Sequence, residues 1–448
     1  MASLYKLHNY CLIIGVLLIG IFAVFLAERA MSFIPLATFY AFVTQMLLLV
    51  SFSGRDEKSL TSKSLLTTVL LYNLIIATVF YLAGYYYKGD LFFLDDPDAM
   101  FYYRDGLMSD KLGFVDNTRR ILNVHPVDDW GILVFSSLMM SIVPSIFFMN
   151  AFYILSGVAS SLMLFYMGKL FMPKRYAFIA SMAYGTSSYI IVFHCTFLKE
   201  SLFIFLVVSA MFCFYKSAIE RKHGLWIGLV LCLLWIFFLR PVVVAFLVFS
   251  FFVYYAIMQR GSALSVFLYI IAIVGAAASF AFLQGEYDNY TGSDESLLAE
   301  SGSSHYSGAF NFFMGWFVSL FGPFPTLFPT ESSGAMPMNL YGAGLIYKAF
   351  LVVPFWAGVV FAILKWNIRM FPLIVFVLAE MGASAVVLAS FELRKVVMHM
   401  PFMYVLSFYG IHCIVQSDMN KSLKKGIELA SYVFPVGVLF IWTVIRVK

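Results

Sequence analysis

The amino-acid sequence predicts an all-α, polytopic helical membrane protein. Of its 448 residues, 62% are hydrophobic and 12% are charged, whereas soluble domains carry about 25% charged residues. Many apolar runs reach roughly 20 residues, the length that crosses the hydrocarbon core of a bilayer. Runs such as 10–27 also lack the alternation of polar and apolar residues that a membrane β-barrel requires. We therefore expect a single transmembrane domain over residues 1–448, with about 13 transmembrane helices.

The expected transmembrane helices are the apolar runs, taken in chain order. They cover residues 10–28, 32–53, 64–86, 151–171, 176–195, 199–217, 224–239, 241–258, 263–284, 341–364, 370–391, 397–416 and 430–446. Two further apolar stretches, 131–149 and 309–329, are ambiguous. The five cysteines are scattered, mostly within apolar runs, so they indicate neither a disulfide framework nor a metal site.

The distribution of basic residues decides the two ambiguous stretches. Cytoplasmic loops carry an excess of Lys and Arg, and we place the N-terminus inside on this basis. A full crossing at 131–149 would put the basic residues at 174–175 and 216–222 outside. A re-entrant or amphipathic helix at the outer face keeps both groups inside, and the same treatment of 309–329 keeps every later basic cluster inside as well.

This topology creates two large external regions, 87–150 with interfacial helices and 285–340 with one interfacial helix. The first of them contains FLDDPDAMFYYRDG (93–106), with four aspartates among aromatic residues. A solvated loop would account for these acids. A carboxylate at the membrane surface would instead act as a general base or as a cation ligand. Asp96 or Asp98 is the expected base, with Asp96 preferred because the proline after it restricts its backbone.

Charged residues beside or within apolar runs add further candidates. Arg240 is embedded in FFLRPVVVAF, and an intramembrane arginine is costly enough to suggest function unless it only snorkels to the outer interface. FLKES places Lys199 and Glu200 in a short outer turn between two spans. They are either ordinary interfacial charges or a phosphate-binding lysine beside a second acid.

The segment FELRKVVMHMPF places basic residues on the outer side, against the positive-inside trend. Arg394, Lys395 and His399 therefore suggest an anionic ligand, since Arg binds phosphate through two N–H groups and Lys acts as a point charge. Lys348 and Glu380, inside apolar spans, are either a buried structural pair or pocket groups. Carboxylates and cations on one face suit a phosphate-bearing lipid and a hydroxylic partner.

The order of these motifs resembles the GT-C superfamily, the polytopic glycosyltransferases that use polyprenyl-phosphate-linked sugars. DDPDAMFYY (95–103) matches the acidic motif of the first external loop, and HPVDDWGILVF (125–135) matches a His-Pro helix at the outer face. FLKESLFIFL matches a second acidic motif at Glu200, and LRKVVMHMPFMYVLSFYG matches a late Arg-containing segment. GPFPTLFP is similar to an external segment of bacterial polysaccharide-locus members. Three spans precede the acidic loop here, where the family usually has one.

The resemblance implies a GT-C-like fold in a bacterial inner membrane, with the active site facing outside. Asp96 or Asp98 would deprotonate a hydroxyl acceptor (a glycan, lipid or protein), and the cations would stabilise the lipid phosphate as leaving group. The expected catalytic residues are Asp96 and Asp98. The expected substrate-binding residues are Tyr102, Arg104, His125, Lys199, Glu200, Arg240, Arg394, Lys395 and His399.

No motif indicates a cofactor, and the use of a divalent cation stays open. The expected partners are a polyprenyl-phosphate-linked sugar, a glycan or lipid acceptor and membrane lipid, with no nucleic acid. Two other functions fit the same sequence. One is an O-antigen or capsule polymerase, which would also use external arginines. The other is a transporter or flippase for a lipid-linked sugar, which needs charged groups near the midplane of the membrane.

Overall fold

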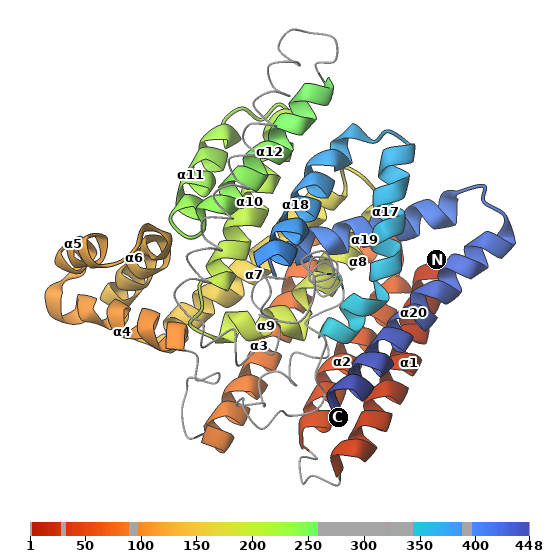
Figure 1. Cartoon of the computed structure of the whole chain (residues 1–448), viewed down its shortest axis with the longest axis horizontal. Coiled ribbons are helices and arrows are strands. Elements are labelled where there is room, and N and C mark those ends of the chain that lie inside the picture. Colours follow the sequence, from red (N-terminus) through yellow and green to blue (C-terminus); the bar gives the residue numbers. More distant parts are fainter. Residues whose placement is uncertain are drawn as a thin grey trace.

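The computed structural model describes residues 2–27, 33–88, 97–258, 320, 344–387 and 397–447, and over these residues the chain is helical without any strand (Figure 1). The helices before the first long gap are α1 Ala2–Ala27, α2 Phe33–Ser53, α3 Ser62–Lys88, α4 Pro97–Leu112, α5 Phe114–Val124, α6 Val127–Ile142, α7 Ile146–Gly168, α8 Lys174–Gly185, α9 Ser188–Cys195, α10 Glu200–Ala218, α11 Leu225–Phe237 and α12 Pro241–Met258. The later helices are Gly344–Phe350, α17 Val352–Leu364, α18 Phe371–Val387, α19 Met400–Gln416 and α20 Lys421–Val447.

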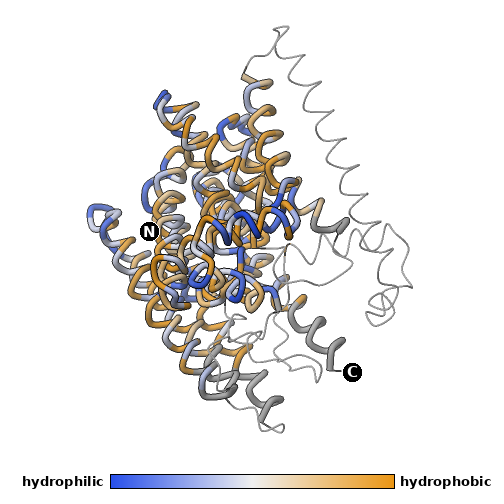
Figure 2. The backbone as a smooth tube through the Cα atoms, turned by 90° about the vertical axis from the view of Figure 1, so that its left-hand side faces the viewer, coloured by the Kyte–Doolittle hydropathy of each residue, from blue (hydrophilic) through white to orange (hydrophobic). Residues whose placement is uncertain are grey.

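Several of these helices are long and apolar enough to cross a membrane, as the hydropathy colouring of Figure 2 shows. In the described part of the chain four qualify singly, namely residues 62–82 of α3, α7, α10 and α12, and two bent helix pairs raise the number to six. The prediction of an all-α chain is therefore confirmed, and the apolar helices indicate a membrane protein. The larger number of about 13 spans stays a prediction. The expected span 263–284 and the stretch 309–329, apart from Leu320, lie outside the described residues.

The run expected as one span at 176–195 is a bent pair, because α8 and α9 meet at 47° around residues 186–187. Amide side chains from two other helices satisfy the carbonyl groups at the end of α8. Gln45 of α2 donates to the Ala183 carbonyl at 3.1 Å, and Asn73 of α3 donates to the Gly185 carbonyl at 2.7 Å. These bonds replace the helical hydrogen bonds that the bend removes, as a break within a membrane requires.

The run expected at 341–364 is also bent, by 45° between the helix Gly344–Phe350 and α17. Its first residue packs directly on the other bend, since the Gly344 N–H donates to the Ser188 hydroxyl at 3.0 Å. A Cβ atom on Gly344 would lie 2.5 Å from the Ser187 hydroxyl oxygen, so only glycine allows this approach. The start of the second bent span therefore packs against the bend of the first.

Helices α17 and α19 approach each other equally closely. A Cβ atom on Gly358 would lie 2.1 Å from the Leu406 carbonyl oxygen, and one on Gly410 would lie 2.1 Å from the Pro354 carbonyl oxygen. Small residues at a helix crossing allow backbones to approach, which is how membrane helices gain packing energy where the hydrophobic effect gives none.

Helices α4, α5 and α6 form a lobe beside the bundle (Figure 1). The stretch 131–149, expected as an outer-face helix, is divided here: α6 ends at Ile142 and α7 begins at Ile146. Helix α6 packs mainly on α4 and α5, and less on α7, the membrane-length helix that follows it. Its placement at the outer face stays a prediction.

The basic clusters expected on the cytoplasmic side meet at one end of the bundle. Lys174 and Arg175 donate to carbonyl groups of the α2–α3 loop, at 3.0 and 2.7 Å. Lys169 and Lys216 both lie against the ring of Tyr166. Since Lys216 lies in the last turn of α10 and Glu200 is its first residue, Glu200 lies at the opposite end of a membrane-length helix.

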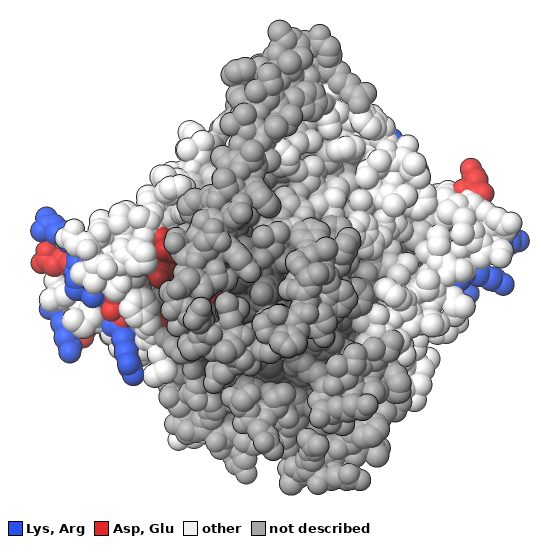
Figure 3. All heavy atoms as spheres, viewed as in Figure 1, with Lys and Arg blue, Asp and Glu red and all other residues white. Residues whose placement is uncertain are grey.

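Charged side chains lie at the margins of the molecule in Figure 3, over the α4–α6 lobe and near the start of α20. White surface separates these margins on the described parts of this face. Helices α1 and α20 also contact each other, with the rings of Tyr10 and Tyr432 5.6 Å apart.

Candidate functional site

The candidate site lies where the start of α10 meets α4, α6 and the α11–α12 turn. Asp129, in the first turn of α6, accepts two hydrogen bonds there. Its Oδ1 atom accepts from Lys199 Nζ at 2.9 Å and from the Tyr102 hydroxyl at 3.1 Å. The ammonium group of Lys199 also lies 6.0 Å from the centre of the Tyr102 ring. The Asp129 carboxylate thus connects α6 to α4, through Tyr102, and to the turn before α10, through Lys199.

Arg240 and Glu200 form the second ion pair of the site. Arg240 NH2 lies 3.4 Å from Glu200 Oε1, and the two side chains are 28% and 2% exposed. The guanidinium group lies over the Phe203 ring and reaches Met398 Sδ at 3.8 Å. Glu200 is the first residue of α10, where the helix dipole favours a negative charge. Arg240 therefore connects the α11–α12 turn to the segment that begins α19.

Tyr102 lies among the carboxylates of the site. Burial raises the pKa of the Tyr102 phenol well above its usual value, and the charges of Asp129, Asp98 and Glu200 raise it further. Its hydroxyl group therefore stays protonated and serves as a hydrogen-bond donor. The same interactions place Asp98, in the first turn of α4, within electrostatic range of this hydroxyl.

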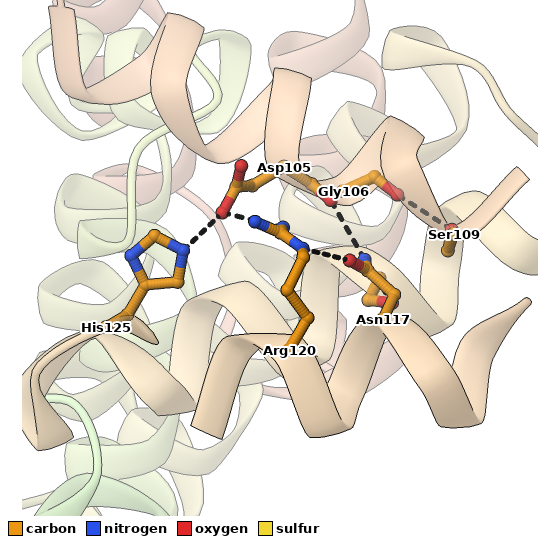
Figure 4. Close-up of polar contacts among 7 residues, drawn as sticks. Asp105, Gly106, Ser109, Asn117, Arg120 and His125 are labelled. Carbon is orange, nitrogen blue, oxygen red and sulfur yellow. Dashed lines mark hydrogen bonds and ion pairs between the residues drawn. The ribbon is translucent and has the colours of Figure 1, made fainter. Parts of the chain in front are cut away.

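A separate polar cluster holds the α4–α6 lobe together (Figure 4). Asp105 Oδ2 lies 2.7 Å from His125 Nε2 and 3.0 Å from Arg120 NH2. Both contacts are short enough for ion pairs, but their N–H groups are not aligned with the carboxylate oxygen as hydrogen bonds require. Asn117 donates to the Asp105 carbonyl at 2.9 Å and to the Ser137 hydroxyl at 3.0 Å. The cluster joins all three helices of the lobe and so fixes the start of α6, where Asp129 lies.

The expected site residues thus fall into three groups. The structure brings Tyr102, Lys199, Glu200 and Arg240 together, with Asp98 in electrostatic range. It places others elsewhere: Arg104 is exposed on α4, His125 faces Asp105, and His399 is fully buried with its Nδ1 against Glu380 Oε2. Asp96, Arg394 and Lys395 lie outside the described residues.

His399 occupies the bundle interior rather than the exposed part of the site. Glu380 and Lys348 are buried there as well, and Lys348 lies within electrostatic range of Glu380. Met398, which precedes His399 in the chain, contacts Arg240. The buried residues His399, Glu380 and Lys348 therefore adjoin the Arg240–Glu200 pair. The interpretation of Lys348 and Glu380 as a buried pair agrees with this arrangement.

Sequence reasoning missed two kinds of site residue. Asp129 belongs to the HPVDDW motif, but Asp128 precedes it, and only the phase of α6 decides which of the two faces Lys199. Asn150 and Tyr153 belong to the apolar run of α7, where an Asn and a Tyr give no distinctive signal. Asn150 donates to the Cys195 carbonyl, and Tyr153 lies within electrostatic range of Glu200.

Among the described residues, no group of three or more His, Cys, Asp or Glu side chains is arranged to hold a metal ion. Asp95 and Asp96 lie outside that part of the chain, so the question of a divalent cation stays open.

No protein-family model, no curated protein and no solved structure matches this chain. The likeness to the GT-C superfamily therefore rests on the motifs quoted above, and the chemistry of the site rests on its own residues.

Proposed function

We propose that the chain is a membrane glycosyltransferase that moves a sugar from a polyprenyl-phosphate carrier to a hydroxyl acceptor at the extracytoplasmic face. The observation that carries the proposal is the convergence of Lys199 and Arg240 on a group of carboxylates around Tyr102. Such a site offers cations for a phosphate and carboxylates for hydroxyl groups within one neighbourhood.

Arg240 is the principal phosphate ligand in this proposal. Its contact with Glu200 is a single N–O distance of 3.4 Å, and its other terminal nitrogen contacts only a thioether sulfur among the described residues. Most of the guanidinium N–H groups therefore remain available, and 28% of the side chain is exposed. A planar guanidinium in this state can bind two phosphate oxygens at once. Lys199, held by Asp129, adds a second positive charge nearby.

The proposed reaction conserves its atoms and charges within these residues. The acceptor hydroxyl gives its proton to an aspartate of the α4 start, either Asp98 or the preceding Asp96. The acceptor oxygen then forms a bond to the anomeric carbon while the bond from that carbon to the phosphate oxygen breaks. The departing polyprenyl phosphate gains negative charge, which Arg240 and Lys199 stabilise.

Substitution of Arg240 tests the proposal. The purified protein in detergent would be incubated with a panel of polyprenyl-phosphate-linked hexoses and a glycan acceptor extract, and the release of polyprenyl phosphate would be measured. We expect Arg240→Ala to lower the rate of polyprenyl phosphate release 100-fold or more, on the order of the effect of one charge contact in the transition state. Arg240→Lys should recover only part of this rate, because lysine cannot bind two phosphate oxygens as the guanidinium does.

Arg119→Ala is the matched control, because Arg119 is 75% exposed on α5 and pairs with Asp116 within its own helix. It should keep nearly normal transfer. Equal activity of the wild type and the Arg240→Ala variant would contradict the proposal.

Transport of a lipid-linked sugar is a second candidate function, favoured by the two bent spans. Discontinuous helices that meet within the membrane are typical of transporter binding sites, and here Gly344 donates to Ser188 at the junction of two such spans. Proteoliposomes decide between the two functions. A transferase consumes the lipid-linked sugar without moving it across the bilayer, whereas a transporter moves it unchanged.

A further inference from the structure

Beneath the ion pairs, three buried polar atoms have no hydrogen-bond partner in the part of the chain that the structure describes. They are Glu200 Oε2, Asn150 Oδ1 and the Tyr153 hydroxyl. Their residues are 1%, 1% and 0% exposed. Buried polar atoms are nearly always paired, and an unpaired oxygen of a buried carboxylate is especially costly. Three such atoms in one neighbourhood point to a bound group that would satisfy them.

The three atoms lie at the junction of α7, α9 and α10. Asn150 and Tyr153 are three residues apart on α7 and so share a face of that helix. Asn150 donates to the Cys195 carbonyl, at the end of α9, at 3.3 Å. The Tyr153 hydroxyl lies within electrostatic range of Glu200. Glu200 in turn faces Arg240, so this junction adjoins the proposed phosphate ligand.

The chemistry of these atoms defines the complementary ligand. An ionised Glu200 only accepts hydrogen bonds, and Asn150 has committed its amide N–H groups to the Cys195 carbonyl and the Tyr81 hydroxyl. The junction therefore presents two oxygens that only accept, on Glu200 and Asn150, and the Tyr153 hydroxyl, which both donates and accepts, so a ligand must supply mainly donors. Adjacent sugar hydroxyl groups, or an amide N–H on a sugar ring, supply them. A sugar acid would instead bring a second carboxylate against Glu200, which is strongly unfavourable in a buried site.

We infer that Asn150, Tyr153 and Glu200 form the subsite for the donor sugar, and that this sugar is a neutral hexose or an N-acetylhexosamine rather than a uronic acid. The inference rests on the proposed function, because Arg240 must hold the carrier phosphate for the sugar to reach this junction. A buried water molecule is the competing occupant, since it too can satisfy orphaned polar atoms.

Binding measurements on the intact protein in detergent separate these cases. Three probes would be compared by native mass spectrometry: polyprenyl phosphate alone, polyprenyl-phosphate-linked neutral hexoses, including N-acetylated ones, and the corresponding uronic acids. We expect at least one neutral sugar to raise affinity roughly tenfold over the bare carrier, as a gained buried hydrogen bond does. The uronic acids should give no such increase.

Two variants test the residues. Tyr153→Phe and Asn150→Leu should abolish the gain from the sugar while leaving the affinity for bare polyprenyl phosphate unchanged. Tyr166→Phe is the control, since Tyr166 lies on the same helix at the opposite end, against Lys169 and Lys216. If Asn150→Leu fails to fold, Tyr153→Phe alone still decides, because it removes a single oxygen.

The outcomes distinguish the inference from the function on which it rests. Bare carrier that binds in an Arg240-dependent manner, with no gain from any sugar, would refute the subsite and leave the transferase proposal standing, with water as the occupant. Uronic acids that bind as tightly as neutral sugars would refute the charge selectivity. Bare carrier that does not bind at all would refute both proposals.

Discussion

The ion pair between Lys199 and Asp129 should contribute measurably to stability, unlike the exposed pairs of the same protein. Its charged atoms are 2.9 Å apart, and the side chains are 15% and 21% exposed. At an effective dielectric constant of about 20, two unit charges at this distance attract by about 6 kcal/mol. Desolvation and side-chain ordering offset most of that attraction, so a net coupling of about 1–2 kcal/mol remains.

A double-mutant cycle isolates this coupling. Asp129→Asn, Lys199→Met and the double variant would be unfolded with SDS in mixed micelles and followed by tryptophan fluorescence, with the coupling taken from the non-additivity of the two changes. Asparagine keeps an oxygen that can accept from Tyr102, so the cycle removes the charge and spares that hydrogen bond.

Arg119 and Asp116 provide the comparison cycle. They form a pair at 3.3 Å within α5, with side chains 75% and 67% exposed. Exposed helical pairs contribute about 0.3–0.5 kcal/mol, so the coupling should be several times smaller than at Lys199–Asp129. Equal couplings, or a value near zero at Lys199–Asp129, would show that burial does not strengthen the pair and would refute the reasoning.

Three further predictions concern topology, pH and packing. Cysteines at the exposed positions Asp110 and Lys222 should label with a membrane-impermeant reagent from opposite sides, and labelling of both from outside would disprove the topology. Tyr102→Phe should lower transfer by the same factor at every pH from 5 to about 10, because the raised pKa keeps the phenol protonated throughout; a ratio that changes with pH in this range would contradict it. Gly410→Ala should destabilise by about 1–3 kcal/mol, since its Cβ would lie 2.1 Å from a carbonyl oxygen, whereas Gly382→Ala, with no atom within 4 Å of its Cβ, should be neutral or stabilising by thermal unfolding.

The membrane helices were predictable because their signal is local. An apolar run of about 20 residues needs no partner to be recognised, and α7, α10 and α12 begin and end within a few residues of the expected spans. The bend between α8 and α9 was not predictable in the same way. Gln45 and Asn73, more than 100 residues earlier in the chain, hold it open, and a hydropathy pattern carries no information about such distant hydrogen bonds.

The candidate site was predictable where a charge is costly. Lys199, Glu200 and Arg240 attract notice because ionised groups beside or inside apolar runs need a compensating partner, and each has one in the structure. His125, which we also expected to bind substrate, lies beside Asp105 instead of beside these residues, and its role stays a prediction. Its imidazole is the right chemistry for a phosphate, but Asp105 lies one turn of α4 beyond Tyr102 and engages it within the lobe. A sequence shows which residues need partners, and only the fold decides between nearby partners of equal charge.

The gathering of carboxylates at this site has a physical explanation in the helix ends. Asp98 lies in the first turn of α4, Asp129 in the first turn of α6 and Glu200 in the first turn of α10. The N-terminus of each helix carries a partial positive charge that stabilises a negative charge there, which favours the gathering of three carboxylates around Tyr102 at the edge of an apolar bundle. Asp129 pairs with Lys199, and Glu200 pairs with Arg240. Among the described residues each cation has a single carboxylate contact, which does not fully neutralise its charge. A phosphate that enters can therefore share Lys199 and Arg240 without displacing the acids, because the helix dipoles continue to stabilise their charge.

Reversal of one such dipole interaction, by Glu200→Lys, would place a third cation at the helix start with no partner. We expect that variant to lose both transfer and stability, while Glu200→Gln should keep the fold, lose the ordering of Arg240 and weaken the binding of the donor sugar.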